Sequence, residues 1–361
     1  MKDLPAGLTV GVMLVPQGMA YAMIAGLPVV YGLYAALVPQ VIYAAMGTSR
    51  QLAVGPVAMD SLLVAAGLGT VAVAGSDRYI ELALLLALMM GSLQLLLGTF
   101  RLGFLAHFIS KPVISGFTSA AALIIGLNQL PPLTGIALPR SSQLHRLVEG
   151  TVDGLAQFHG PTVLLGTVSI ALLVGLRKGL PRVPGSLVLV VLALASGAVV
   201  PWGTWDIRTL GPIPAGLPGF LVPDWTLGDL QMLFPLAATL AIVAFMEAYS
   251  VAQAAAQKRG DHEIDANQEL RALGSANAIG SLFGAYPVTG GFSRTAVNER
   301  AGAVSGMSSL IAAGVVALAL TFLTPVFRNL PSAVLGAIIA VAVAGLVAVS
   351  YTHLRAHETS E

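Results

Sequence analysis

One polar stretch, AYPVTGGFSRTAVN at residues 285–298, stands out in an apolar chain because its residue types could perform chemistry. Pro287 can end a helix, and the pair Gly290 and Gly291 lets the backbone turn before a new helix begins. The first N–H groups of a helix have no intrahelical partner and carry partial positive charge, and the hydroxyl of Ser293 lies close by. Lipid cannot pair such groups, so the break must face protein or a cavity. We therefore expect an anion-binding site there.

A second break lies early in the chain, in RQLAVGPVAMDSLLVAAGL at residues 50–68. An extended approach leads to Gly55 and Pro56, and an apolar helix can begin directly after them. Two short helices that start inside the membrane, one early and one late, are typical of transporters built from inverted repeats. We expect their N-termini to meet near the bilayer midplane and to hold an anion between them. Each break on its own could instead be a kink with packing significance only.

The composition places both breaks in a membrane protein. Hydrophobic residues make up 56% of the 361 residues and charged residues only 10%, against about 25% in an average soluble protein. Uncharged stretches such as 82–100 and 301–327 reach the roughly 18 to 20 residues that cross a bilayer as helix. The chain has no cysteine, a net charge of +1 and no clustered histidines. These features argue against metal sites, cofactors, nucleic-acid binding and enzyme chemistry.

Proline, glycine and charged residues divide the chain into about twelve apolar segments, so we expect an all-α polytopic membrane protein. Lys and Arg favour a cytoplasmic N-terminus, with about eleven in loops on that side against about five on the other. We expect residues 1–200 to form a first repeat, 201–229 an external loop and 230–348 a second, incomplete repeat. The expected segments lie near 6–25, 29–46, 55–74, 80–100, 113–130, 161–176, 185–200, 230–257, 272–286, 290–299, 303–326 and 332–348.

Three motifs carry a resemblance to a known family. They are LTVGVMLVPQGMAYAMIAGLPVVYGLY at 8–34, GTSRQLAVGPVA at 47–58 and GAYPVTGGFSRTAVNERAGA at 284–303. In this order they resemble the SulP family of sulfate and related anion transporters, and the resemblance runs to about residue 348. It implies two inverted seven-helix repeats, a core domain and a gate domain, a homodimer, and a cytoplasmic STAS domain after the membrane part.

The C-terminal end departs from this pattern. VSYTHLRAHET at 349–359 places two His, an Arg and a Glu where an apolar helix should continue or close. It looks like the translation of a sequencing adapter, so we interpret 349–361 as a non-native tail, with a genuine polar tail as the alternative. We expect the last two helices of the second repeat and the STAS domain to be absent from the sequence as it stands.

The resemblance further implies which residues line the anion site. Gln17 would offer a polar contact and Tyr21 an aromatic wall, although Gln17 could serve only an interhelical hydrogen bond. Backbone N–H groups at the two helix starts would point at the anion. Arg294 would add positive potential, or could form a structural ion pair. The expected substrate-binding residues are Gln17, Tyr21, Val57, Ala58, Gly291, Phe292, Ser293 and Arg294.

Glu247 is the expected coupling residue. It stands in a segment, 230–257, that carries no other charge, and it resembles the carboxylate that couples transport in the family. Desolvation favours its protonated form and a nearby cation its ionised form, so its proton could respond to anion occupancy. A permanent salt bridge and a sodium site are the alternatives. Asp60 is a second carboxylate within an apolar segment, for which the sequence names no partner.

The leading hypothesis is a secondary active transporter of a small inorganic anion, with sulfate carried by proton symport through alternating access. A sodium-coupled bicarbonate or dicarboxylate transporter fits the same architecture. An uncoupled anion channel is a third possibility and should survive loss of Glu247. We expect the protein in the cell inner (plasma) membrane.

Overall fold

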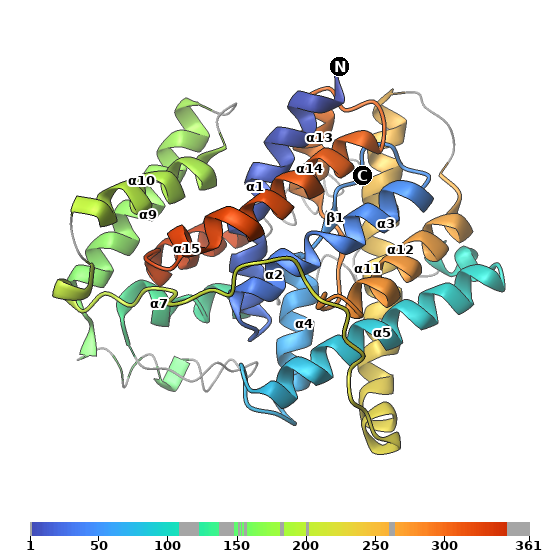
Figure 1. The fold of residues 1–361 in the computed structure, drawn as a ribbon, viewed down its shortest axis with the longest axis horizontal. Helices are drawn as coiled ribbons and strands as arrows, with labels where there is room; N and C mark the ends of the chain where they lie inside the picture. The colour runs from blue at the N-terminus through green and yellow to red at the C-terminus, as the bar shows by residue number, and fades with distance from the viewer. Residues whose placement is uncertain are drawn as a thin grey trace, which may run out of the picture. The chain divides into compact units, whose positions relative to one another are not determined.

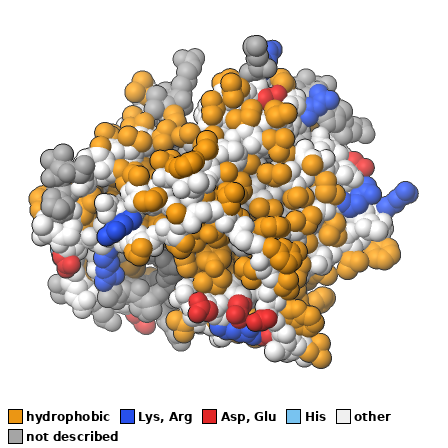
Figure 2. Space-filling model, viewed as in Figure 1, with side chains coloured by type: hydrophobic (Ala, Val, Ile, Leu, Met, Phe, Trp, Pro, Cys, Tyr) orange, Lys and Arg blue, Asp and Glu red, His pale blue; other side chains and the backbone are white. Residues whose placement is uncertain are grey.

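The computed structural model describes residues 2–107, 123–136, 148–150, 152, 154, 157–180, 184–199, 202–259 and 264–344. Helices dominate these residues (Figure 1). Within the described ranges, six helices are long and apolar enough to cross a membrane. The face in Figure 2 is mostly hydrophobic, with Lys, Arg, Asp and Glu side chains gathered in small groups. The expected all-α membrane architecture is confirmed.

One compact unit combines residues 1–108 with residues 214–324, so segments from both ends of the chain pack together in it. Its elements are α1 (Asp3–Ile24), α2 (Val29–Ala35), α3 (Val38–Met46), β1 (Val54–Gly55), α4 (Ala58–Leu68), α5 (Asp77–Thr99), the 3-10 helix η1 (Leu102–His107), α11 (Leu227–Arg259), α12 (Ala266–Ser281), β2 (Thr289–Gly290), α13 (Phe292–Arg300), α14 (Met307–Leu318) and the π-helix η4 (Ala319–Leu323).

The other compact unit combines residues 109–213 with residues 325–361. Its described elements are α7 (Leu130–Thr134), α9 (Gly160–Gly179), α10 (Gly185–Val199), the 3-10 helix η3 (Trp202–Trp205) and a helix over Ser332–Ala344. The short helix α15 (Thr324–Phe327) begins at the last residue of the first unit along the chain and continues into the second. Most of the expected segment 113–130 and the tail 349–361 lie outside the described residues.

The two expected breaks are present, and each contains a two-residue strand before a short helix. β1 and β2 pair antiparallel, with Val54 opposite Gly290 and Gly55 opposite Thr289. α4 begins three residues after β1, and α13 begins two residues after β2 (Figure 1). The extended backbone of each break forms hydrogen bonds with that of the other. This pairing supplies partners for N–H and C=O groups that lipid cannot bind.

Close packing of α5 against α12 depends on two glycines. A Cβ added to Gly274 would lie 2.6 Å from the backbone N of Leu95 and 2.8 Å from the O of Gly91. A Cβ added to Gly91 would lie 2.7 Å from the O of Gly274. Small residues let membrane helices approach backbone to backbone, and here they bring α12 close enough to position the late break that follows it.

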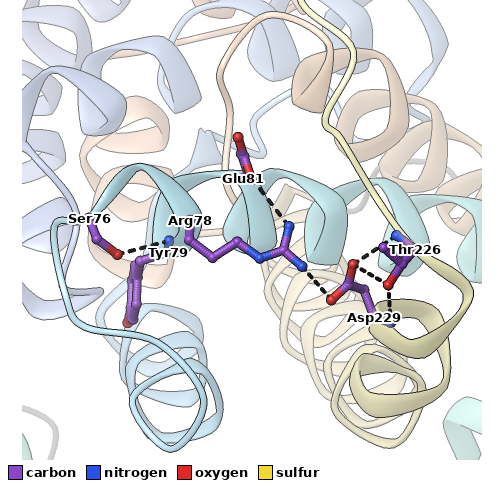
Figure 3. A network of polar contacts seen from close by, with 6 residues as sticks. All are labelled: Ser76, Arg78, Tyr79, Glu81, Thr226 and Asp229. Carbon is purple, nitrogen blue, oxygen red and sulfur yellow. Dashed lines mark hydrogen bonds and ion pairs between the residues drawn. The ribbon is translucent and has the colours of Figure 1, made fainter.

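A polar network joins the starts of α5 and α11 (Figure 3). Arg78 donates to Asp229 over 2.5 Å and to Glu81 over 3.3 Å. The other oxygen of Asp229 accepts from the N and Oγ1 of Thr226, at 2.7 and 2.8 Å. Ser76 caps α5 by accepting from the N of Tyr79 at 3.2 Å. These contacts fix the N-terminal ends of the two long helices side by side.

The region before residue 272, which the expected segments leave between two helices, is partly helical. α12 begins at Ala266, where the Asp265 side chain accepts from the N of Asn267 and of Gln268. Glu269 is fully buried in this helix rather than solvated. Its carboxylate accepts hydrogen bonds from Tyr43 and Thr48. Glu269 therefore holds α12 to the residues around α3 and does not lie in a loop.

Other boundaries shift by a few residues. The expected segment 29–46 is two helices, α2 and α3, because the chain turns before Pro39, which occupies the first turn of α3. The expected segment 55–74 is helical only from Ala58 to Leu68, since Val57 is still extended. The segment expected at 303–326 runs from α14 into a π-helical turn and α15.

Candidate functional site

Hydrogen bonds across the strand pair tie the late break to the early one. The N of Gly291 donates to the O of Ala53 over 3.1 Å, and the N of Ala53 donates to Oγ1 of Thr295 over 3.1 Å. Asn298, one turn further along α13, donates to the O of Gln51 over 2.9 Å. α13 is therefore held along its buried face to the residues that lead into α4.

The starts of both short helices lack side-chain caps. Val57 precedes α4 and Gly291 precedes α13, both with extended backbone, and neither supplies a side-chain acceptor to the first turn. Helix-start N–H groups without such an acceptor are free to bind an anion, and the helix dipole favours negative charge there. The two starts thus form matching halves of a site for an anion.

Arg294 lies at the junction of the two breaks. Its side chain is buried, and Nη1 donates to the O of Pro56 over 2.8 Å. Nε and Nη2 are buried without a hydrogen-bond partner. A Cβ on Gly291 would lie 2.7 Å from Nη2, so the guanidinium folds back over the start of α13. The residue expected to add positive charge is therefore anchored by one donor and keeps two donors free.

Glu247 and Tyr21 complete the charged centre. Glu247 on α11 interacts electrostatically with Arg294, and Tyr21 on α1 interacts with both. One carboxylate oxygen of Glu247, Oε2, is buried without a hydrogen-bond partner. α1 and α11 each pack against both α4 and α13, which brings these side chains to the two helix starts. Among the described residues, Arg294 is anchored by its hydrogen bond to the O of Pro56 and not by an ion pair.

The remaining expected residues occupy two kinds of surroundings. Gln17 is buried, and its Oε1 has no hydrogen-bond partner among the described residues. Val57 and Ala58 are buried at the start of α4. Phe292 is 53% exposed and Ser293 is also exposed, which leaves the first turn of α13 open on one side. A ligand could reach the site from that side.

Several positioning residues could not be identified from the sequence. Asn277 on α12 grips the late break through Val288, accepting from its N at 2.9 Å and donating to its O at 3.0 Å. Thr289 donates to the O of Ala244 on α11 over 2.5 Å. These residues are polar side chains in apolar or glycine-rich surroundings, which was the only available signal. In the described part of the chain, no group of three or more His, Cys, Asp or Glu could hold a metal ion.

Comparisons with known proteins agree with one another. The sequence profile of the Sulfate permease family matches residues 1–361. The chain is 44% identical over 351 residues to sulfate transporter 4.1, chloroplastic, of Arabidopsis thaliana, covering 96% of this chain and 51% of that protein. It therefore spans about half the length of that curated relative.

Solved structures with the same fold are also found. The overall structure of SLC26A9 aligns with a TM-score of 0.89 at 28% identity, covering 96% of this chain and 57% of that one. The transmembrane domain of BicA, a cyanobacterial bicarbonate transporter, aligns with a TM-score of 0.87 at 25% identity, covering 96% of this chain and 89% of that one. Both alignments cover 96% of this chain, so the chain shares its overall fold with these two structures.

Proposed function

Because the chain belongs to the sulfate permease family, we propose that it is the membrane part of a secondary active transporter of a small inorganic anion, with sulfate as the first candidate. Sulfate is named for the Arabidopsis relative, which is 44% identical. A helix-start site selects charge more than shape, so the identity of the anion rests on this similarity and not on the geometry.

The observation that carries the proposal is the position of Arg294. Its guanidinium lies between two uncapped helix starts, with one donor on Pro56 and two buried donors unpartnered. A buried cation whose donors lack acceptors costs free energy in a membrane protein unless a ligand accepts hydrogen bonds from them. An anion that accepts from Arg294 and from the helix-start N–H groups would do so. Gln17, Tyr21 and Ser293 would complete its surroundings.

Glu247 is the group that we propose to couple transport to a proton. Its electrostatic interaction with Arg294 means that a bound anion competes with the carboxylate for the same positive charge. When the anion binds, the ionised carboxylate loses that compensation, and protonation becomes favourable. Anion and proton would then enter together, and both would leave when the site opens to the other side.

Alternating access would come from relative movement of the two compact units, one of which holds both short helices. We place the N-terminus in the cytoplasm, the protein in the plasma membrane, and expect a homodimer in the lipid bilayer. One feature favours this orientation. The loops assigned to the inside carry about eleven Lys and Arg residues, against about five on the other side.

The test is labelled sulfate uptake into proteoliposomes that contain the full-length protein, with and without an inward proton gradient. We expect the gradient to drive accumulation of sulfate. The matched variant is Glu247→Gln, which keeps the size of the side chain but cannot ionise. It should bind sulfate, and its stimulation by the gradient should be weaker than that of the wild type.

Two outcomes would contradict this reading in different ways. Equal gradient stimulation in Glu247→Gln would remove Glu247 from coupling. No sulfate flux in folded protein, together with sodium-driven bicarbonate uptake, would favour the sodium-coupled alternative, for which similarity to the BicA fold is the specific support. Flux that needs neither gradient and survives Glu247→Gln would indicate a channel.

A further inference from the structure

Asp60 is a buried carboxylate that the site described so far does not use. It lies in the first turn of α4, three residues after Val57, and is 0% exposed. Both of its carboxylate oxygens are buried without a hydrogen-bond partner. Such a group in a helix start next to an anion site calls for an explanation.

A second buried carboxylate of the same chain behaves in the opposite way. Glu269 is also 0% exposed, but it accepts from Tyr43 OH at 2.7 Å, from the N and Oγ1 of Thr48 at 2.7 and 2.5 Å, and from the N of Ser49 at 3.3 Å. Such a set of donors stabilises an ionised carboxylate. The structure thus supplies donors where a buried charge serves architecture, and it supplies none to Asp60.

The groups around Asp60 are acids and phenols. From α11, the charged neighbour that interacts with it is Glu247, which is another carboxylate. From the segment before β2, Tyr286 interacts with it, while the hydroxyl of that tyrosine lies 3.0 Å from Oγ of Ser61.

Within the described part of the chain, the other elements that pack against α4 bring no cation to Asp60. The ionisable group of α1 in this region is Tyr21, which interacts with Glu247 and Arg294. On α5, Arg78 is engaged with Glu81 and Asp229 at the start of the helix. Arg294 interacts with Glu247, Tyr21 and Tyr286. Hence Arg294 compensates Glu247, whereas no cation of the described residues forms an ion pair or a hydrogen bond with Asp60.

An ionised carboxylate without donors or a cation is costly to bury, whereas a protonated carboxyl in the same place is tolerated. Asp60 and Glu247 lie near one cation, which compensates only Glu247, so both cannot stay ionised at low cost once an anion lies beside them, and their protons are coupled. Entry of an anion adds negative charge beside both. The favourable state with the anion bound therefore carries a proton on each acid.

We infer that Asp60 is a second proton-binding carboxylate of the anion site, so that Asp60 and Glu247 each carry one proton with the anion. This inference rests on the proposed function. Both carboxylates take up a proton from the side where the anion enters, and both release it on the side where the anion leaves, when water enters the vacated site and solvates the ionised groups. For a divalent anion the two protons balance its charge. The loaded site then has the same net charge as the empty site, so transport moves no net charge across the membrane.

The experiment measures proton and labelled sulfate fluxes together in proteoliposomes of the full-length protein, with the membrane potential clamped by potassium and valinomycin. We expect about two protons per sulfate in the wild type and about one in Asp60→Asn. Because one negative charge then enters uncompensated, sulfate uptake by Asp60→Asn should slow when the interior is made negative, unlike uptake by the wild type. Asp60→Glu should restore the wild-type ratio.

Ser61→Ala is the matched control, because it changes the next residue of α4 and removes the hydroxyl contact with Tyr286 but no proton-binding group. Its ratio should stay at about two. Infrared difference spectra of the wild type and of Asp60→Glu on sulfate addition give an independent readout, in which two carboxyl groups should gain protons.

A ratio of about one in the wild type would overturn the inference, as would an unchanged ratio in Asp60→Asn, since Asp60 would then stay protonated throughout. Sodium uptake in place of the second proton would also overturn it. Failure of the wild type to move sulfate at all would instead contradict the proposed function itself. Proton-coupled uptake with a ratio that falls in Asp60→Asn but not in Ser61→Ala supports both.

Discussion

At the residue scale, the guanidinium of Arg294 has both a structural and a ligand-binding role. Arg294 fixes the early break by donating to the O of Pro56, and it offers further donors toward the helix starts. A lysine could carry the charge but has no rigid fork with which to do both. Loss of the side chain should therefore remove a structural bond and a ligand contact together.

We expect Arg294→Ala to weaken sulfate binding by about 10- to 100-fold, the range for one or two charge-assisted hydrogen bonds. Arg294→Lys should lie between this variant and the wild type. Ser293→Ala, which removes a neutral hydroxyl at the exposed side of the same turn, should cost only about 2- to 10-fold. Titration of each purified variant with sulfate measures these effects. Wild-type affinity in Arg294→Ala would exclude the late break from the site.

The sequence could locate Arg294 and Glu247 because a charge inside an apolar stretch is conspicuous. It could not assign partners to Thr295 or Asn298, whose side chains contact residues more than 240 positions away. Hydroxyl and amide groups form such bonds only where folding brings the backbone to them, and no local pattern records that approach. For the same reason, the sequence could not show that Asp60 interacts with Glu247, which lies on a different helix.

At the element scale, α12 is the helix on which the late break depends, and it is clamped at its start. Glu269 binds Tyr43 and the loop after α3 through Thr48 and Ser49, and Gln268 donates to the O of Met46 over 2.7 Å. Asn277 on the same helix holds Val288. Displacement of α12 would therefore disturb the start of α13 through the residues between them.

Glu269→Ala should destabilise the protein by on the order of 3 kcal/mol, because several buried donors lose their acceptor at once. The midpoint of thermal unfolding in detergent should fall by on the order of 5–10 °C. Glu81→Ala is the control, since it removes a carboxylate from an exposed pair with Arg78 (Figure 3), which contributes less than about 1 kcal/mol. Equal midpoints for the two variants would show that the clamp does not stabilise the fold.

Gly274→Val should separate α5 from α12, because its side chain would meet the backbone of Leu95 and Gly91. Overpacking of this kind costs typically about 1–3 kcal/mol. Gly175→Val on α9 is the matched control, as a Cβ there meets nothing within 4 Å. Thermal unfolding of both variants measures the difference, and an unchanged midpoint in Gly274→Val would mean that the helices adjust without cost.

At the scale of the whole molecule, both compact units interleave the early and late parts of the chain. The sequence predicted the helices well, since hydrophobic length and glycine or proline breaks are local signals. It could not predict which segments share a unit, because that depends on pairings such as Val54 with Gly290. Charge distribution is the one sequence signal that acts on the entire molecule, through its orientation in the membrane.

That orientation is directly testable because the chain has no cysteine, so any introduced thiol is the single site of labelling. Gly219, in the stretch before α11, is exposed, and a side chain there meets nothing within 4 Å. Lys2, which we assign to the cytoplasmic side, is exposed directly before the start of α1. We expect Gly219→Cys to react with a membrane-impermeant maleimide added to intact cells, and Lys2→Cys to react only after permeabilisation. Removing one of about eleven inside charges should not reverse the protein. The reverse pattern would place the N-terminus outside the cell. Anion and protons would then enter the site from the end that we have assigned to the cytoplasm.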